Sequence, residues 1–132
     1  MKTYLRSIAF LFVTALLTSC ATCPICAPKG KVEHIVLAWL KKPGNAADRA
    51  KIVAAAKDLK AGIPQVKALS VGQVLLSERP IVDDSFDVAL VMRFNSKEDM
   101  QAYEKHPVHV KAVKEVLQPL TSKVVVYDFV TE

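Results

Sequence analysis

Cysteine is absent from the chain after residue 26, and all three cysteines lie between Cys20 and Cys26. A disulfide framework across the remaining residues is therefore excluded. A structural zinc site with four thiolate ligands is excluded too, because such a site needs a second pair of cysteines. Any chemistry that the later residues perform must use other side chains.

Lysine and arginine form no dense block, although they outnumber the acidic residues. The chain has 18 Lys and Arg against 13 Asp and Glu, a formal net charge of +5 at pH 7. Two of the basic residues, Lys2 and Arg6, lie at the start of the chain. A nucleic-acid-binding domain concentrates its basic residues in a patch or stripe. We therefore expect no nucleic-acid partner.

The apolar run from Ile8 to Leu17 is too short for a permanent membrane span. As a helix it would cover roughly 15 Å, about half of a bilayer core. A short apolar run after basic residues is typical of a secretory signal peptide. The run ends in Leu17-Thr18-Ser19-Cys20, which resembles a bacterial lipobox. We therefore expect residues 1–19 to be a lipoprotein signal peptide and Cys20 to carry lipid such as palmitate.

A lipid-anchored protein of this kind would lie in the bacterial cell envelope. Several acyl chains on one cysteine give stable membrane attachment, whereas a single chain is marginal. Ala21 follows the cysteine, whereas an Asp there tends to retain lipoproteins in the inner membrane. The expected location is the outer membrane, with the protein facing the periplasm.

Residues 20–31 read as a Pro-rich tether that contains the pair Cys23 and Cys26. No predicted strand precedes this Cys-Pro-Ile-Cys motif, so it lacks the context of a thioredoxin-type redox site. Export to an oxidising compartment favours a local or intermolecular disulfide. Free thiols near the membrane are the next alternative, and a redox or metal role is the least favoured.

Residues 32–132 form one predicted domain with the order β-α-β-β-α-β. Apolar and polar residues alternate in "FDVALVMRF", which indicates a strand, and Asn45 and Ser96 are suitable helix N-caps. Pro107 interrupts the second helix, whose apolar stripe is expected to continue through Val110, Val113, Val116 and Leu117. The expected strands cover residues 32–40, 66–76 (with a possible bulge at Gly72), 86–94 and 123–130, and the helices cover 46–60 and 97–118. This order predicts an α+β, ferredoxin-like fold with a four-stranded antiparallel sheet and both helices on one face.

The first and last predicted strands are apolar on both faces. Two helices can cover only one face of the sheet, and a large exposed apolar face usually marks an interface. A second copy, packed sheet against sheet, is the simplest partner. We therefore expect a homodimer. One face of these strands carries Ile35, Leu37, Trp39, Val125, Tyr127 and Phe129, and the other carries Val36, Leu40, Val124, Val126 and Val130.

Three stretches, "HIVLAWL", "FDVALVMRFNSKEDMQAYEKHPVHV" and "VVVYDFV", resemble the stress-responsive dimeric A/B barrel family. The most specific match is Tyr103-x-x-His106-Pro107-x-His109-Val110, together with His34 near the start of the domain. The resemblance implies a dimeric α/β barrel built from two ferredoxin-like units, and a role in stress response.

The resemblance also implies a site. In plant polyketide cyclases of this family, the residues that match Tyr103 and His109 form the catalytic pair, and a histidine matching His34 lines the pocket between the second helix and the sheet. His106, Val88 and Leu90 are expected in the same pocket. A neutral imidazole can remove a proton next to a carbonyl, and a phenol can hydrogen-bond the developing enolate oxygen.

A structural role for these residues is favoured over catalysis. The two imidazoles near Pro107 can satisfy backbone groups that the proline frees, Tyr103 can pack with its hydroxyl at a rim, and His34 can bind a helix end. We expect a membrane-tethered, stress-related protein that binds a small apolar ligand or a partner, without a cofactor or a metal. The alternative is a cyclase-like enzyme acting on a carbonyl substrate.

Overall fold

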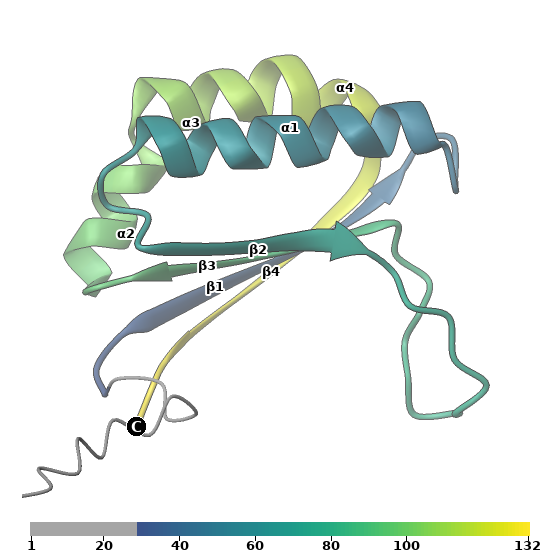
Figure 1. Cartoon of the computed structure of the whole chain (residues 1–132), viewed down its shortest axis with the longest axis horizontal. Helices are drawn as coiled ribbons and strands as arrows, with labels where there is room; N and C mark the ends of the chain where they lie inside the picture. The colour runs from purple at the N-terminus through teal and green to yellow at the C-terminus, as the bar shows by residue number, and fades with distance from the viewer. Residues whose placement is uncertain (1–28) are drawn as a thin grey trace, which may run out of the picture.

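The computed structural model describes residues 29–132, which form one sheet and one helical layer (Figure 1). The predicted signal peptide, the lipid attachment at Cys20 and the pairing of Cys23 with Cys26 lie outside these residues and stay predictions. Among the described residues, no helix has the length and hydrophobicity of a membrane span. The elements are β1 (Val32–Leu40), α1 (Ala46–Gly62), β2 (Ala68–Gln73), β3 (Val88–Phe94), α2 (Lys97–Glu104), α3 (Pro107–Ala112), η1 (Val113–Leu117), α4 (Gln118–Leu120) and β4 (Thr121–Val130).

The four strands form an antiparallel sheet in the order β2-β3-β1-β4. Val36 on β1 lies opposite Leu90 on β3 and Val126 on β4. All helices lie on one side of the sheet (Figure 1). This is the α+β ferredoxin-like fold that the sequence predicts.

The predicted N-caps are confirmed. The Asn45 side chain accepts a hydrogen bond from the Asp48 backbone N–H at 2.9 Å, and Ser96 does the same for Asp99 at 3.2 Å. Each bond satisfies one of the backbone donors that have no partner inside the helix. The two caps therefore set where α1 and α2 begin.

The last helical segment widens into a π-turn before β4. The backbone N–H of Gln118 bonds to the carbonyl of Val113, five residues earlier, which gives the π-helix η1. Such π-turns are frequent at functional sites, and this one forms part of a pocket wall.

Several predicted details of the elements are wrong. The second strand is shorter than expected, and Gly72 pairs regularly with Ala89 without a bulge. Val110 is 51% exposed, whereas Val108 and Ala112 on the same helix pack against the core. The helix starts afresh at Pro107, and residues 108 and 112 then share the face that meets α1.

The core lies between the helices and the sheet. The backbone N–H of Gly30 donates to the carbonyl of Thr131, and the N–H of Thr131 donates to the carbonyl of Lys31, each at 2.8 Å. The two ends of the described residues are therefore paired, and a fragment of residues 29–132 keeps this pairing together with the core side chains. Its largest fully buried side chains are Tyr103, Phe94, Leu40, Ile63 and Met92.

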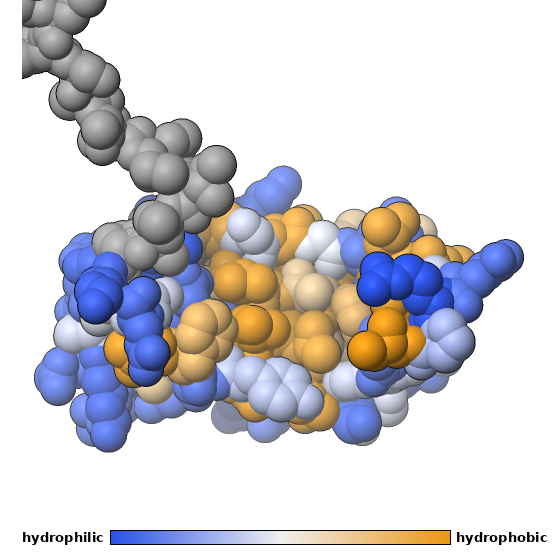
Figure 2. All heavy atoms as spheres, turned by 90° about the horizontal axis from the view of Figure 1, so that it is seen from below, coloured by the Kyte–Doolittle hydropathy of each residue, from blue (hydrophilic) through white to orange (hydrophobic). Residues whose placement is uncertain are grey.

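The opposite face of the sheet is uncovered in the single chain. Figure 2 shows this face from below, with a hydrophobic centre. Tyr127 is 57% exposed there and Phe129 is 49% exposed. We call this surface the open face. Because side chains alternate along a strand and β1 pairs with β3 and β4 in register, it is built from Ile35, Leu37, Trp39, Ala89, Val91, Val125, Tyr127 and Phe129.

Candidate functional site

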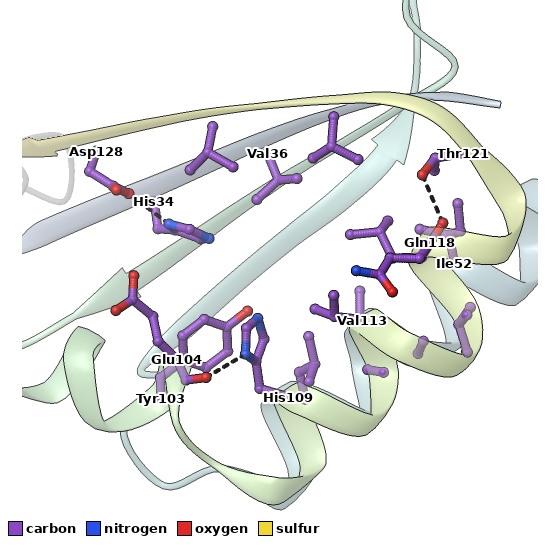
Figure 3. Close-up of a pocket in the computed structure, with 18 residues that line it drawn as sticks. His34, Val36, Ile52, Tyr103, Glu104, His109, Val113, Gln118, Thr121 and Asp128 are labelled. Atoms are coloured by element: carbon purple, nitrogen blue, oxygen red, sulfur yellow. Dashed lines mark hydrogen bonds and ion pairs between the residues drawn. The ribbon is translucent and has the colours of Figure 1, made fainter.

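A pocket of about 510 Å³ lies between the helical layer and the β1–β4 side of the sheet. It is open at β4, where Val124 and Val126 line it and are 37% and 46% exposed. The walls are mainly aliphatic, and the polar lining groups lie toward the two ends (Figure 3). The aliphatic wall includes Val36, Ile52, Val113, Val116, Val124 and Val126.

His34 enters the pocket from β1 and is held by Asp128 on β4. The strand register places the two residues opposite each other, and His34 Nδ1 lies 2.6 Å from Asp128 Oδ1. An ionised carboxylate only accepts hydrogen bonds, so the bond is donated by Nδ1–H. In the neutral ring, Nε2 is then left as an acceptor. The expectation that His34 binds a helix end is therefore wrong, because its partner is a strand residue.

Tyr103 packs between the two histidines that line the pocket. Its ring centroid lies 5.8 Å from that of His34 and 4.4 Å from that of His109, and Phe94 supports it at 5.0 Å. Burial raises the pKa of the Tyr103 hydroxyl far above its ordinary value, and the charge of Glu104 raises it further. The phenol therefore keeps its proton at physiological pH, so it can donate a hydrogen bond to a bound molecule.

His109 is oriented by the helix break at Pro107. The break leaves the carbonyl of Glu104 without a helical partner, and His109 Nδ1 lies 2.9 Å from that oxygen. A carbonyl can only accept, so Nδ1 carries the proton and Nε2 is the acceptor in the neutral ring. The predicted structural role of this imidazole is confirmed, and the same ring also lines the pocket (Figure 3).

His106, Val88 and Leu90 do not line the pocket, contrary to expectation. His106 is the N-cap of α3, and its Nδ1 accepts from the Val108 backbone N–H at 3.2 Å. Val88 and Leu90 are buried in the core. They lie on the helix-facing side of the sheet, as predicted, but on β3, whereas the pocket lies over β1 and β4.

The charges around the pocket are of one sign. Two carboxylates line it, from Glu104 and Asp128, and no lysine or arginine does. At the other end, Gln118 lies near Thr121, whose hydroxyl donates to the carbonyl of Leu117 at 2.7 Å. Within residues 29–132, no three His, Cys, Asp or Glu side chains are grouped closely enough to hold a metal ion.

Sequence reasoning missed Asp128 as a site residue. It lies in the terminal stretch "VVVYDFV", whose apolar pattern indicates a strand and draws no attention to its single carboxylate. Antiparallel pairing of the first and last strands would have brought Asp128 near His34, since both residues lie on the helix-facing side. The contact between Asp128 and His34 could therefore have been predicted, but only with the register of the first and last strands.

Comparison with known proteins identifies the family. The model of the stress responsive A/B barrel domain matches residues 32–131. A stress-response A/B barrel domain-containing protein of Arabidopsis thaliana is 32% identical over 103 residues, which cover 76% of this chain and 37% of that protein. The chain thus spans little more than a third of the length of this relative.

Two similar solved structures differ in what is known of them. The hydroxynitrile lyase from Passiflora edulis is 25% identical with a TM-score of 0.65, and the match covers 80% of this chain and 96% of the lyase. A dimeric protein of unknown function with a ferredoxin-like fold, from Bacteroides fragilis, is 25% identical with a TM-score of 0.60, covering 77% and 97%. The chain belongs to the stress responsive A/B barrel domain family.

Proposed function

We propose that this domain forms a homodimer and binds a small, mostly apolar, uncharged molecule in the pocket of each protomer. The observation that carries the proposal is the pocket itself, in which aliphatic walls surround a few converging polar groups. This combination is typical of small-molecule sites. Stress response, implied by the family, is the setting in which we place this binding.

The polar end of the pocket defines the head group of the ligand. The Tyr103 hydroxyl offers a donor, and the Nε2 atoms of His34 and His109 offer acceptors. A hydroxyl or carbonyl compound matches these groups. A carboxylate does not, because Glu104 and Asp128 would repel it and no cation lines the pocket.

The open face supports the homodimer. Its apolar centre, with Tyr127 and Phe129 about half exposed, resembles an interface more than a solvated surface. The similar Bacteroides fragilis protein is dimeric. A two-fold dimer would bury the same patch on both protomers, and the pocket on the other side of the sheet would stay accessible.

Selectivity for the head group tests the binding proposal. We expect 1-decanol to displace the neutral fluorescent probe N-phenyl-1-naphthylamine from the fragment 29–132. Decanoate has the same chain length but carries a charge, and the repulsion from nearby carboxylates should weaken its binding at least about tenfold. The variants Glu104→Gln and Asp128→Asn should narrow this difference. Decanoate binding equal to or tighter than that of 1-decanol would contradict the proposal.

The second candidate function is that of an enzyme acting on a carbonyl compound. His109 Nε2 is free to accept a proton, and the Tyr103 hydroxyl beside it can donate to a developing oxyanion. The similarity to a hydroxynitrile lyase favours this candidate. It predicts that the fragment splits mandelonitrile into benzaldehyde and hydrogen cyanide: His109 Nε2 takes the hydroxyl proton, the C–CN bond breaks, and the departing cyanide takes up the proton. Absorbance follows the benzaldehyde, and His109→Gln should abolish its release while 1-decanol still binds. If the unmodified fragment releases no benzaldehyde, the proposed enzymatic function is contradicted.

A further inference from the structure

The loop between β2 and β3 exposes three large aliphatic side chains. Leu75 is 86% exposed, Leu76 is 76% exposed and Ile81 is 85% exposed. The loop leaves the sheet on the side opposite the helices (Figure 1). A single exposed leucine is ordinary, but three aliphatic side chains that are almost fully exposed in one loop indicate an interaction surface. We call residues 74–87 the β2–β3 arm.

Internal hydrogen bonds give the arm a defined shape. The Ser77 backbone N–H donates to Asp84 Oδ2 at 2.9 Å, and the Val82 N–H donates to the carbonyl of Arg79 at 3.0 Å. The Ser85 N–H donates to an oxygen of Asp83, also at 3.0 Å. The aliphatic side chains are therefore presented from a turn that polar groups stabilise.

The base of the arm is continuous with the open face. Trp39, on that face, donates a hydrogen bond from Nε1 to the Ser85 hydroxyl at 3.0 Å, and its ring meets that of Phe86 edge to face at 6.4 Å. Figure 2 shows the arm projecting at one end of the hydrophobic centre. A partner that covers the open face would therefore meet the arm as well.

The position of the arm favours a second copy of the chain over a lipid surface. The described chain begins beside Thr131, at the Val32 end of β1. The arm lies at the other end of β1, where the Asp87 N–H donates to the carbonyl of Ala38. The predicted lipid tether, which precedes these residues, would therefore join the described chain at the end of the sheet opposite the arm.

We propose that the β2–β3 arm packs against the second copy of this chain and clasps the sheet-to-sheet dimer. The proposal rests on the proposed homodimer and adds a contact outside the open face. In a two-fold dimer the arm of each protomer contacts the other protomer, so the same contact occurs twice. The hydrophobic side chains of the arm supply affinity, and its hydrogen-bonded turn limits the entropy lost on binding.

The arm can be tested without disturbing the core. The triple variant Leu75→Ser, Leu76→Ser, Ile81→Ser of the fragment 29–132 should raise the dimer Kd at least about tenfold in sedimentation equilibrium, because burial of aliphatic surface is lost. Val110→Ser, on an exposed helix position away from both surfaces, is the matched control and should leave the Kd unchanged.

The outcomes separate the arm from the homodimer itself. An unchanged Kd in the folded triple variant overturns the clasp while the open face remains the dimer interface. A monomeric unmodified fragment at about 100 µM, the scale of a weak interface, overturns the homodimer and the clasp together. Binding of the fragment to phosphatidylglycerol vesicles that depends on the three side chains, with an unchanged Kd, assigns the arm to a membrane and overturns the clasp.

Discussion

A fragment of residues 29–132 that carries Ile35→Lys is expected to be monomeric at concentrations where the unmodified fragment is dimeric. Ile35 lies on the central strand β1, between Val91 of β3 and Tyr127 of β4. A lysine there would be buried without a partner in each half of the dimer, at a cost of several kcal/mol. The expected loss of dimer affinity is at least about 100-fold, measurable by sedimentation equilibrium.

Two adjacent residues on β4 provide the control. Tyr127 is 57% exposed on the open face and Val126 is 46% exposed on the pocket face. Both are exposed enough in the single chain for a lysine to leave the fold intact. Tyr127→Lys should dissociate the dimer, and Val126→Lys should not. If both variants stay dimeric, or if both dissociate equally, the open face is not the interface.

Partly filling the pocket is expected to weaken ligand binding while the fold and the dimer stay unchanged. Val113 is half-buried on η1 and lines the pocket. The variant Val113→Phe would occupy the space of part of the ligand. Phenylalanine has four more side-chain carbons than valine, and losing about four ligand atoms at roughly 0.3 kcal/mol each corresponds to about eightfold weaker binding. Displacement of N-phenyl-1-naphthylamine measures the effect.

The matched control for this variant lies on the preceding helix. Val110 on α3 is 51% exposed and does not line the pocket. Val110→Phe adds the same bulk to the same kind of residue, so it should leave binding of the probe unchanged. Equal loss in the two variants would mean that the probe does not bind in this pocket.

The order of elements follows directly from the sequence. Period-two alternation in β3, the caps Asn45 and Ser96, and Pro107 at the start of α3 each act locally, over a few residues. These features can be predicted from the sequence because they depend on interactions between residues that are close together in the chain. The apolar pattern of β1 and β4 on both faces likewise predicts an open face.

The site was predicted only in part, because its geometry depends on register and on position across the sheet. The resemblance to the family pointed to His34, Tyr103 and His109, and the structure brings all three to one pocket. Asp128 was missed because its meeting with His34 depends on the pairing of the first and last strands. The sequence correctly predicts that Val88 lies on the helix-facing side of the sheet. The alternation of side chains along a strand does not show, however, which strands the helices leave uncovered.

Histidine NMR during titration with 1-decanol tests whether the pocket binds an apolar ligand with a hydroxyl head group. The chain has 3 histidines, and two of them, His34 and His109, line the pocket. The third, His106, caps α3 outside the pocket and serves as an internal control. We expect saturable shifts of the His34 and His109 ring signals and a stationary His106 signal. No shift at His34 and His109, or a shift at His106 alone, would show that 1-decanol does not bind in the pocket.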